Sequence, residues 1–203
     1  MSWGCGWETH TRDANYVLDA DGDSRLLWRF PPRRMEAEAI RDNILLVSDV
    51  PDLRMGGPGF SAFEVQKENV RHYFPKKSYG PSDWRRMIYM TKVRQEQDSV
   101  FGVFDCPDAS QTVPKRSRST TPLQALNLFN SVFSMGQSRH MEVRLRSEAP
   151  LGVEQQVQHA FALTFSRRAT ADELRSSIMF VNSHGLPAFY RAMLNANEFL
   201  FVP

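Results

Sequence analysis

The chain has 203 residues, a length that suits one domain with its own hydrophobic core. Hydrophobic residues make up 41% and charged residues 24%, which is ordinary for a globular protein, and the net charge of +2 offers no general attraction for nucleic acid. No apolar run approaches the roughly 20 residues that a membrane-spanning helix needs. We therefore expect no nucleic-acid partner and no membrane span.

Residues 1–24 have no hydrophobic period, and they lack the charged start and the apolar stretch of a signal peptide. We predict that this segment is poorly ordered or is a truncated leader. Residues 25–203 are expected to form a single helical domain, the C-terminal part of a larger protein.

Neither the cysteines nor the histidines indicate a metal or haem site. Cys5 and Cys106 lie in segments of different character, and neither belongs to a Cys-x-x-Cys pair, so their spacing supports neither a disulfide nor a zinc site. The histidines include no pair at i and i+3 or i+4, the spacing that holds a metal on one helix face. We expect no metal and no cofactor in this chain.

The first clear helix is predicted from Arg33 to Ser48. One face of this helix carries charged residues at spacings of three or four, namely Arg34, Glu38, Arg41 and Asp42. These side chains form either surface ion pairs, each worth about 0.2–0.5 kcal/mol, or a buried polar ladder that holds the central loop. Taken alone, the face favours the surface pairs. The apolar residues that recur near the 3.6-residue period, and would face a core, are Met35, Ala39, Ile40, Ile44 and Val47.

Glycine and proline interrupt the chain between Val50 and Phe60, which disfavours both helix and strand there. From Arg86 to Val93, side chains alternate in the manner of a short strand, and Val100 to Phe104 could pair with it. The expected fold is therefore mainly α: an irregular helical domain with long loops and at most a short β-hairpin near residues 86–104.

A second long helix is predicted to begin after Thr121. Thr121 would be the N-cap, Pro122 the first helical residue and Gln124 the third, which is the pattern of a capping box. The helix should continue to about Glu148 with one apolar side directed at the core. That side holds Leu123, Leu126, Phe129 and Phe133.

The residues that lead into this helix combine carboxylates with cations. Lys115, Arg116 and Arg118 stand just upstream of the unpaired amides of the helix start, which together favour a bound anion. Alternatively, the arginines pair with Asp105 and Asp108 and the loop holds no ligand, since local ion-pair networks mimic functional sites. Both interpretations stay open.

Three more helices are predicted after Glu148. Thr170 with Glu173 forms a capping box at the start of the second, and Gly185 is well placed to end it. The apolar residues from Phe199 to Val202 would pack on the bundle, since each large side chain gains about 1.5–3 kcal/mol from burial. The helices are expected at Val153–Phe165, from Ala171 to about Asn182 and at Leu186–Asn197.

Six motifs from Leu26 onwards occur in the order that is typical of a known family. They are Leu26-Leu-Trp-Arg-Phe, Arg33-Arg-Met-Glu-Ala-Glu-Ala-Ile-Arg-Asp, Met55-Gly-Gly-Pro, Phe104-Asp-Cys-Pro-Asp, Arg116-Ser-Arg-Ser-Thr-Thr-Pro-Leu-Gln-Ala-Leu and Asn195-Ala-Asn-Glu-Phe-Leu. On these motifs the protein resembles the planctomycete-type C-terminal domain of unknown function, DUF1553.

The resemblance implies a setting more than an activity. It implies a large exported parent protein with cytochrome-c-like domains, located in the cell envelope or outside the cell and often associated with polysaccharide-degrading genes. Haem would then lie only in a separate upstream domain, and the upstream domains of the same parent would be the first partners. The chain departs from the family in lacking a signal peptide. It also has Cys106 where a small residue is expected, which argues against Cys106 as a family nucleophile.

Two functions are compatible with these residues, and whether the protein is an enzyme stays open. The first is a non-catalytic binding or docking domain, because no catalytic triad, metal quartet or phosphate loop is recognisable; its ligand could be an anionic glycan. The alternative is a hydrolase-like enzyme acting on a glycan or sulfated sugar. Asp105 and Asp108 would then be acid and base, with Arg116 and Arg118 as anion clamps.

The central loop is predicted to dock on the charged face of the first helix, so that the chain's most specific motifs form one polar cluster. A short distance between the side chains of Arg116 and Glu38 would support this arrangement, and positions on opposite sides of the domain would contradict it. The cluster would hold Arg34, Glu38, Arg41, Asp42, Arg116 and Arg118.

Overall fold

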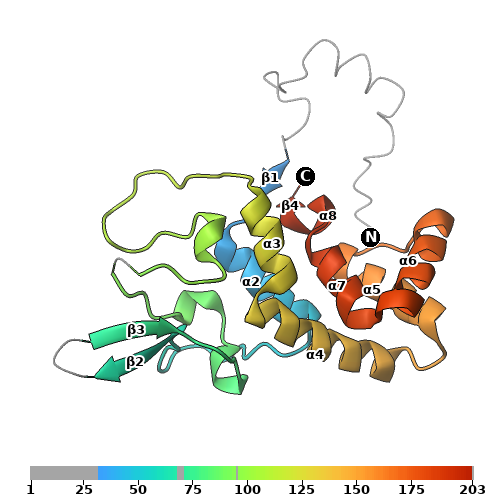
Figure 1. Ribbon diagram of the computed structural model, residues 1–203, viewed down its shortest axis with the longest axis horizontal. Coiled ribbons are helices and arrows are strands. Elements are labelled where there is room, and N and C mark those ends of the chain that lie inside the picture. The colour runs from blue at the N-terminus through green and yellow to red at the C-terminus, as the bar shows by residue number, and fades with distance from the viewer. Residues whose placement is uncertain (1–31, 68–70, 95, 203) are drawn as a thin grey trace, which may run out of the picture.

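The computed structural model describes residues 32–67, 71–94 and 96–202, and helices dominate them (Figure 1). The mainly α fold class expected from the sequence is thereby confirmed. The expectations for residues 1–24, for Cys5 and for the motif at Leu26 lie outside the described residues. The helices are α2 (Ala37–Val47), α3 (Pro122–Asn130), α4 (Val132–Glu148), α5 (Val153–Phe165), α6 (Ala171–His184), α7 (Leu186–Leu194) and α8 (Asn197–Leu200). The strands are β1 (Arg33–Arg34), β2 (Phe63–Lys67), β3 (Arg71–Pro75) and β4 (Phe201–Val202).

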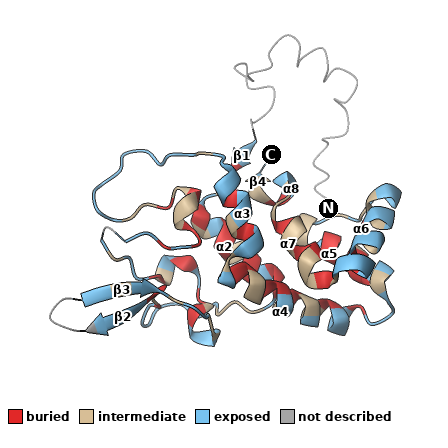
Figure 2. Cartoon of the chain, viewed as in Figure 1, coloured by how far each residue is buried: buried red, intermediate tan, exposed pale blue. Residues whose placement is uncertain are grey.

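The core forms where α4 meets α2, α5 and α7, and Figure 2 shows the buried residues concentrated around these helices. Ile44 of α2, Leu145 of α4 and Leu194 of α7 are completely buried. Side chains of this size gain about 1.5–3 kcal/mol each on burial, so this junction is what holds the domain together. Within the described chain, no helix combines the length and apolar character that crossing a bilayer would need.

The first helix starts later than predicted, because Arg33 and Arg34 belong to a strand. β1 pairs antiparallel with β4, with Arg34 opposite Phe201, and the backbone N–H of Met35 donates to the carbonyl of Leu200 at 2.8 Å. Glu36 keeps an extended backbone, and α2 begins at Ala37. Local periodicity could not predict this start, since the pairing partner lies at the far end of the chain.

The β-hairpin is formed by β2 and β3, not near residues 86–104 as predicted. In the predicted region, Met87–Tyr89 makes a 3-10 turn, and Met90 forms only an isolated bridge with Phe60. The alternation of side chains from Arg86 to Val93 reflects this turn, which buries Met87 and exposes Ile88. The true hairpin extends from the domain (Figure 1), so its strands are largely exposed and carry too many polar residues to show a strand pattern.

The long helix predicted from Pro122 to Glu148 is divided at Ser131. Its backbone there is extended, with φ −63° and ψ 147°, and its side-chain oxygen accepts a hydrogen bond from the backbone N–H of Ser134 at 3.2 Å. Ser131 therefore ends α3 and caps α4.

This division changes which side of α3 faces the core. Leu128 is completely buried and Gln124 is 4% exposed, whereas Leu123 and Leu126 are 57% and 61% exposed. The prediction that Leu123, Leu126 and Phe129 face inward is therefore wrong. Only Phe133, which belongs to α4, is buried as predicted.

The remaining helices follow the sequence signals more closely. α5 has the predicted bounds. The capping box of α6 is present, because the N–H of Thr170 donates to Glu173 at 2.8 Å and the N–H of Glu173 donates to the Thr170 hydroxyl at 3.3 Å. Gly185 ends α6 with a positive φ of 81°. α7 is shorter than predicted, because the chain turns into α8 and β4.

Candidate functional site

The central loop, residues 105–121, is fixed to the domain by Arg34. This side chain is only 5% exposed, and its Nη2 donates to Asp105 Oδ2 at 2.6 Å and to the carbonyl of Phe104 at 3.3 Å. Its Nη1 donates to the carbonyl of Ser119. Arg34 thus joins β1 to both ends of the loop. The interpretation of this face as surface ion pairs is wrong here, since the guanidinium is buried and bonds to backbone oxygens.

The Asp105 carboxylate makes its hydrogen bonds to Arg34 and, within the loop, to Ser119. Its carboxylate accepts from the N–H of Ser119 at 2.8 Å and from the Ser119 hydroxyl at 2.9 Å, in addition to Arg34. Burial would raise the pKa of Asp105, but these bonds outweigh burial and hold the pKa below its usual value. Gln124 at the start of α3 also holds the loop in place. Its side-chain amide donates to the carbonyls of Val103 and Ser119 at 2.9 and 3.1 Å.

Arg116 makes the predicted contact with the first helix. Its Nη1 lies 2.8 Å from Glu38 Oε2 and 2.9 Å from Glu36 Oε2. Burial would raise the pKa of Glu38, yet the hydrogen bond from Arg116 and further favourable contacts leave that pKa below normal. Two motifs far apart in the sequence therefore meet at one ion-pair cluster.

Arg41 and Asp42 do not belong to this cluster, which corrects the predicted single site. Arg41 points into the core, where its guanidinium donates to the carbonyls of Arg85 and Asp83 at 2.7 and 2.5 Å. Asp42 accepts from the backbone N–H of Met87 at 2.7 Å. Arg41 and Asp42 lie one helical turn beyond Glu38, three and four residues on, and at that level their partners are the chain at residues 83–87 rather than the central loop. This second group orders the chain around residues 83–87.

Cys106 lies beside the ion-pair cluster, but its thiol is buried and is not activated as a nucleophile. Its sulfur is 2.8 Å from Lys92 Nζ and 3.8 Å from Glu38 Oε1, and the residue is 5% exposed. Burial raises the pKa of this thiol, with the neighbouring lysine only partly opposing it. Lys92 was not predicted as a site residue, because nothing in its local sequence connects it to Cys106.

Asp108 and Asp105 share no hydrogen-bond partner in the described chain. Asp108 accepts hydrogen bonds from the N–H of Ser110 at 2.9 Å and from the Ser110 hydroxyl at 2.7 Å, which lower its pKa. The structure records no bond between Asp108 and an arginine of the described chain. Within the described residues, no group of three or more His, Cys, Asp or Glu side chains could hold a metal ion.

An open hollow of about 900 Å³ lies between β1 and the loop, and we call it the cationic hollow. Lys115 and Arg118 are exposed on it, and neither has an ion-pair or hydrogen-bond partner among the described residues. Arg33 and Glu36 were not predicted as site residues, although Arg33 directly precedes Arg34. The hollow is lined by Arg33, Glu36, Lys115, Arg116, Ser117 and Arg118.

Fold and loop together define a mainly helical domain in which the buried Arg34 fixes a polar loop, and the exposed Lys115 and Arg118 line an open hollow. The chain belongs to the PSD1 family, described as "Protein of unknown function (DUF1553)", whose model matches residues 7–181. The family expected from the motifs is therefore confirmed. Neither curated proteins nor solved structures give a significant match to the chain.

Proposed function

We propose that this chain is a non-catalytic binding domain whose cationic hollow binds an anionic glycan. The observation that carries the proposal is the contrast between Arg116, which Glu36 and Glu38 neutralise, and Lys115 and Arg118, which meet no carboxylate of the described chain. Unneutralised cations around an open hollow attract anions. The guanidinium fork of Arg118 matches the oxygens of a sulfate or carboxylate group.

The hydrolase alternative has weaker support. An acid catalyst needs a pKa raised toward the working pH, whereas both Asp105 and Asp108 have lowered pKa values. Asp105 is also occupied by Arg34 and Ser119, and displacing these partners would release the loop. Of the two proposed anion clamps, Arg116 is already paired and only Arg118 faces the hollow without a partner in the described chain.

We place this binding role in the setting that the sequence motifs imply: an exported protein of planctomycete type, in the cell envelope or outside the cell. Its upstream domains, including a haem-bearing cytochrome-c-like domain, would be the protein partners. This setting rests on what the resemblance of the sequence motifs implies. Sequencing the gene upstream of Met1 checks it, and an upstream frame without a signal peptide would argue against export.

The binding proposal is tested with a sulfated oligosaccharide titrated against the full chain by calorimetry. Replacing Lys115 and Arg118 together with glutamine is expected to weaken binding about tenfold, as two charge-assisted contacts are lost. Binding should also weaken as salt is raised, because exposed charges are screened.

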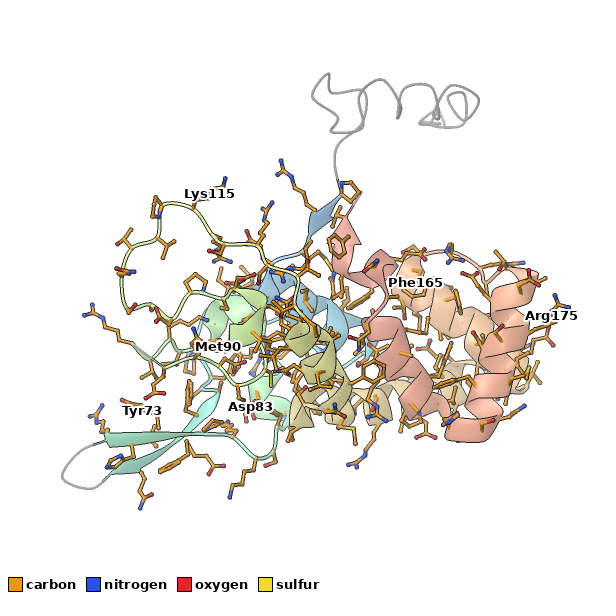
Figure 3. The ribbon with its side chains drawn as sticks, turned by 45° about the horizontal axis from the view of Figure 1, so that its top comes forward. Tyr73, Asp83, Met90, Lys115, Phe165 and Arg175 are labelled. Carbon is orange, nitrogen blue, oxygen red and sulfur yellow. The ribbon has the colours of Figure 1, made fainter. Side chains whose placement is uncertain are left out.

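Arg175→Gln is the matched control. Arg175 is also an exposed cation, but it pairs with Asp172 and lies on α6 at the other end of the molecule from Lys115, as Figure 3 shows. The control should bind like the unmodified chain. Equal losses in both variants, or equally tight binding of an uncharged oligosaccharide, would exclude the cationic hollow. Release of sulfate or shorter sugars from the probe would favour the hydrolase.

A further inference from the structure

Arg116 meets two carboxylates, although it carries a single positive charge. Its Nη1 donates to Glu36 Oε2 at 2.9 Å and to Glu38 Oε2 at 2.8 Å. The Arg116 side chain is 38% exposed, and it lines the cationic hollow together with Glu36. One of the two carboxylates is therefore more than the charge of Arg116 requires.

Glu38 is the carboxylate that holds Arg116 in place. Its side chain is 28% exposed, and its other oxygen lies 3.8 Å from the sulfur of Cys106. The hydrogen bond with Glu38 is the main reason that the pKa of Arg116 is raised, and the charge of Glu36 adds less. Glu38 thus attaches the central loop to α2.

Glu36 is held more weakly. Its side chain is 49% exposed and bonds only to Arg116 within the described chain, and it does not cap α2. Its backbone is extended, and residues two apart in an extended chain point to the same side, so Glu36 shares the side on which Arg34 bonds to the loop. Exposed ion pairs contribute little to stability, so Arg116 can exchange Glu36 for another anion.

We propose that Glu36 is an internal competitor for anions: it occupies Arg116 before a ligand binds, and an anionic group of the ligand displaces it. This competition rests on the proposed function of the cationic hollow. Lys115 and Arg118 attract one anionic group, and a second group replaces Glu36 on the guanidinium of Arg116, which suits sulfate and carboxylate oxygens. The ligand class is thereby narrowed to glycans that carry at least two anionic groups.

Competition by Glu36 makes the hollow select against small anions. A single anion that binds Lys115 and Arg118 leaves Glu36 on Arg116. In a glycan, the second anionic group is linked to the first and reaches Arg116 at a high effective concentration, so it displaces Glu36 where a free ion does not. A built-in repulsive group is a common source of binding specificity.

Calorimetric titration of the full chain with two oligosaccharides of equal length, one polysulfated and one monosulfated, tests the competition. Glu36→Gln is expected to bind the polysulfated probe about three- to tenfold more tightly, the effect of relieving one exposed charge contact. Its gain with the monosulfated probe should stay below about twofold, because Lys115 and Arg118 hold that probe without Arg116. Equal gains with both probes would show general repulsion by Glu36 and would overturn the competition.

A double-variant cycle locates the effect at Arg116. Glu36→Gln should bring no gain in a chain that already carries Arg116→Gln, because the contested cation is then absent. A gain that persists without Arg116 would place the effect elsewhere and count against the proposal. Thermal unfolding of each variant accompanies the titrations. A lowered Tm in Glu36→Gln without tighter binding would give Glu36 a structural role only and exclude competition.

Glu154→Gln is the matched control. Glu154 is an exposed carboxylate in the first turn of α5 and lines a different hollow, and its replacement changes the net charge by the same amount. This variant should bind both probes like the unmodified chain. A gain as large as that of Glu36→Gln would reflect net charge alone and contradict the proposal.

The unmodified chain separates failure of the competition from failure of the hollow itself. If neither the unmodified chain nor Glu36→Gln binds the polysulfated probe, the hollow is no anion site and the competition falls with it. If the unmodified chain binds and Glu36→Gln binds equally or less tightly, only the competition is refuted. Binding by Glu36→Gln alone would support both.

Discussion

Arg34 is the side chain on which the contacts of the central loop converge. It is almost fully buried, and Asp105 supplies its only carboxylate within the described chain. A buried guanidinium needs both charge compensation and filled hydrogen bonds, because desolvation of an isolated charge is costly. Asp105 also has a positive φ of 60°, a conformation that aspartate and asparagine tolerate better than most residues. Its identity is therefore explained by structure alone.

Asp105→Asn is predicted to destabilise the domain by about 2–3 kcal/mol, since it keeps the backbone preference but leaves the buried Arg34 without a counter-charge. Urea unfolding of both proteins measures the loss. Asp108→Asn serves as control, because within the described chain Asp108 bonds only to Ser110 at the exposed part of the loop. The unfolding midpoint of this variant should not move. Similar losses in the two variants would mean that Asp105 has no special role in holding Arg34.

Part of this polar arrangement was predictable from the sequence. Charges at helical spacing near Glu38, with a cationic stretch ahead of a capped helix, predicted the meeting of Glu38 and Arg116. The sequence allowed both surface pairs and a buried polar ladder on this helix face, and it could not decide that Arg34 and Arg41 are buried. Their burial depends on backbone carbonyls of Ser119, Arg85 and Asp83, and the sequence does not indicate where those carbonyls point.

At the scale of elements, local signals located the helices better than their packing. The capping boxes at Thr121 and Thr170 lie where expected, because a cap is formed by residues within one turn. The break at Ser131 and the hairpin at β2 and β3 were missed. The break changes the side of α3 that faces the core. The apolar period therefore predicted the helix correctly but predicted the wrong buried side.

Ser131→Ala is predicted to cost about 1 kcal/mol, the usual loss on removing a serine N-cap, because α4 then begins with an unpaired N–H at Ser134. Thermal unfolding monitored by circular dichroism measures the change. The control is Ser183→Ala near the end of α6, where the hydroxyl bonds back to Met179 O within the helix and alanine is a better helix former. A loss at Ser183 as large as at Ser131 would rule out capping as the reason.

At the scale of the whole molecule, several carboxylates have pKa values below normal in the folded state. Arg167 bonds to Glu173 at 2.7 Å and to Glu198 at 2.6 Å, which ties α6 to α8, and it lowers the pKa of Glu173 to about 2. Glu148 has its pKa lowered chiefly by His159. A lowered folded pKa stabilises the protein above the unfolded value near 4, and this stabilisation is lost as the pH falls through the folded value.

The buried Cys106 and the half-buried Tyr79 act in the opposite direction. Burial raises the pKa of Cys106, and it raises that of Tyr79 to about 12. For such groups the folded state favours the neutral form. Their stabilisation is complete below the unfolded pKa, near 8.5 for a thiol and 10 for a tyrosine, and it is lost as the pH rises through the folded value.

The Tm is therefore predicted to be nearly constant from about pH 5 to 8, and to fall below about pH 4 and above about pH 8.5. Two variants test separately the fall in Tm at low pH, which we call the acid limb, and the fall at high pH, the alkaline limb. Cys106→Ala should reduce the fall between about pH 8.5 and 10, where the thiol ionises more readily in the unfolded chain, and leave the acid limb unchanged. Glu173→Gln should reduce only the acid fall. Circular dichroism melts across this range provide the measurement, and an alkaline limb that persists unchanged in Cys106→Ala would mean that thiol burial does not set it.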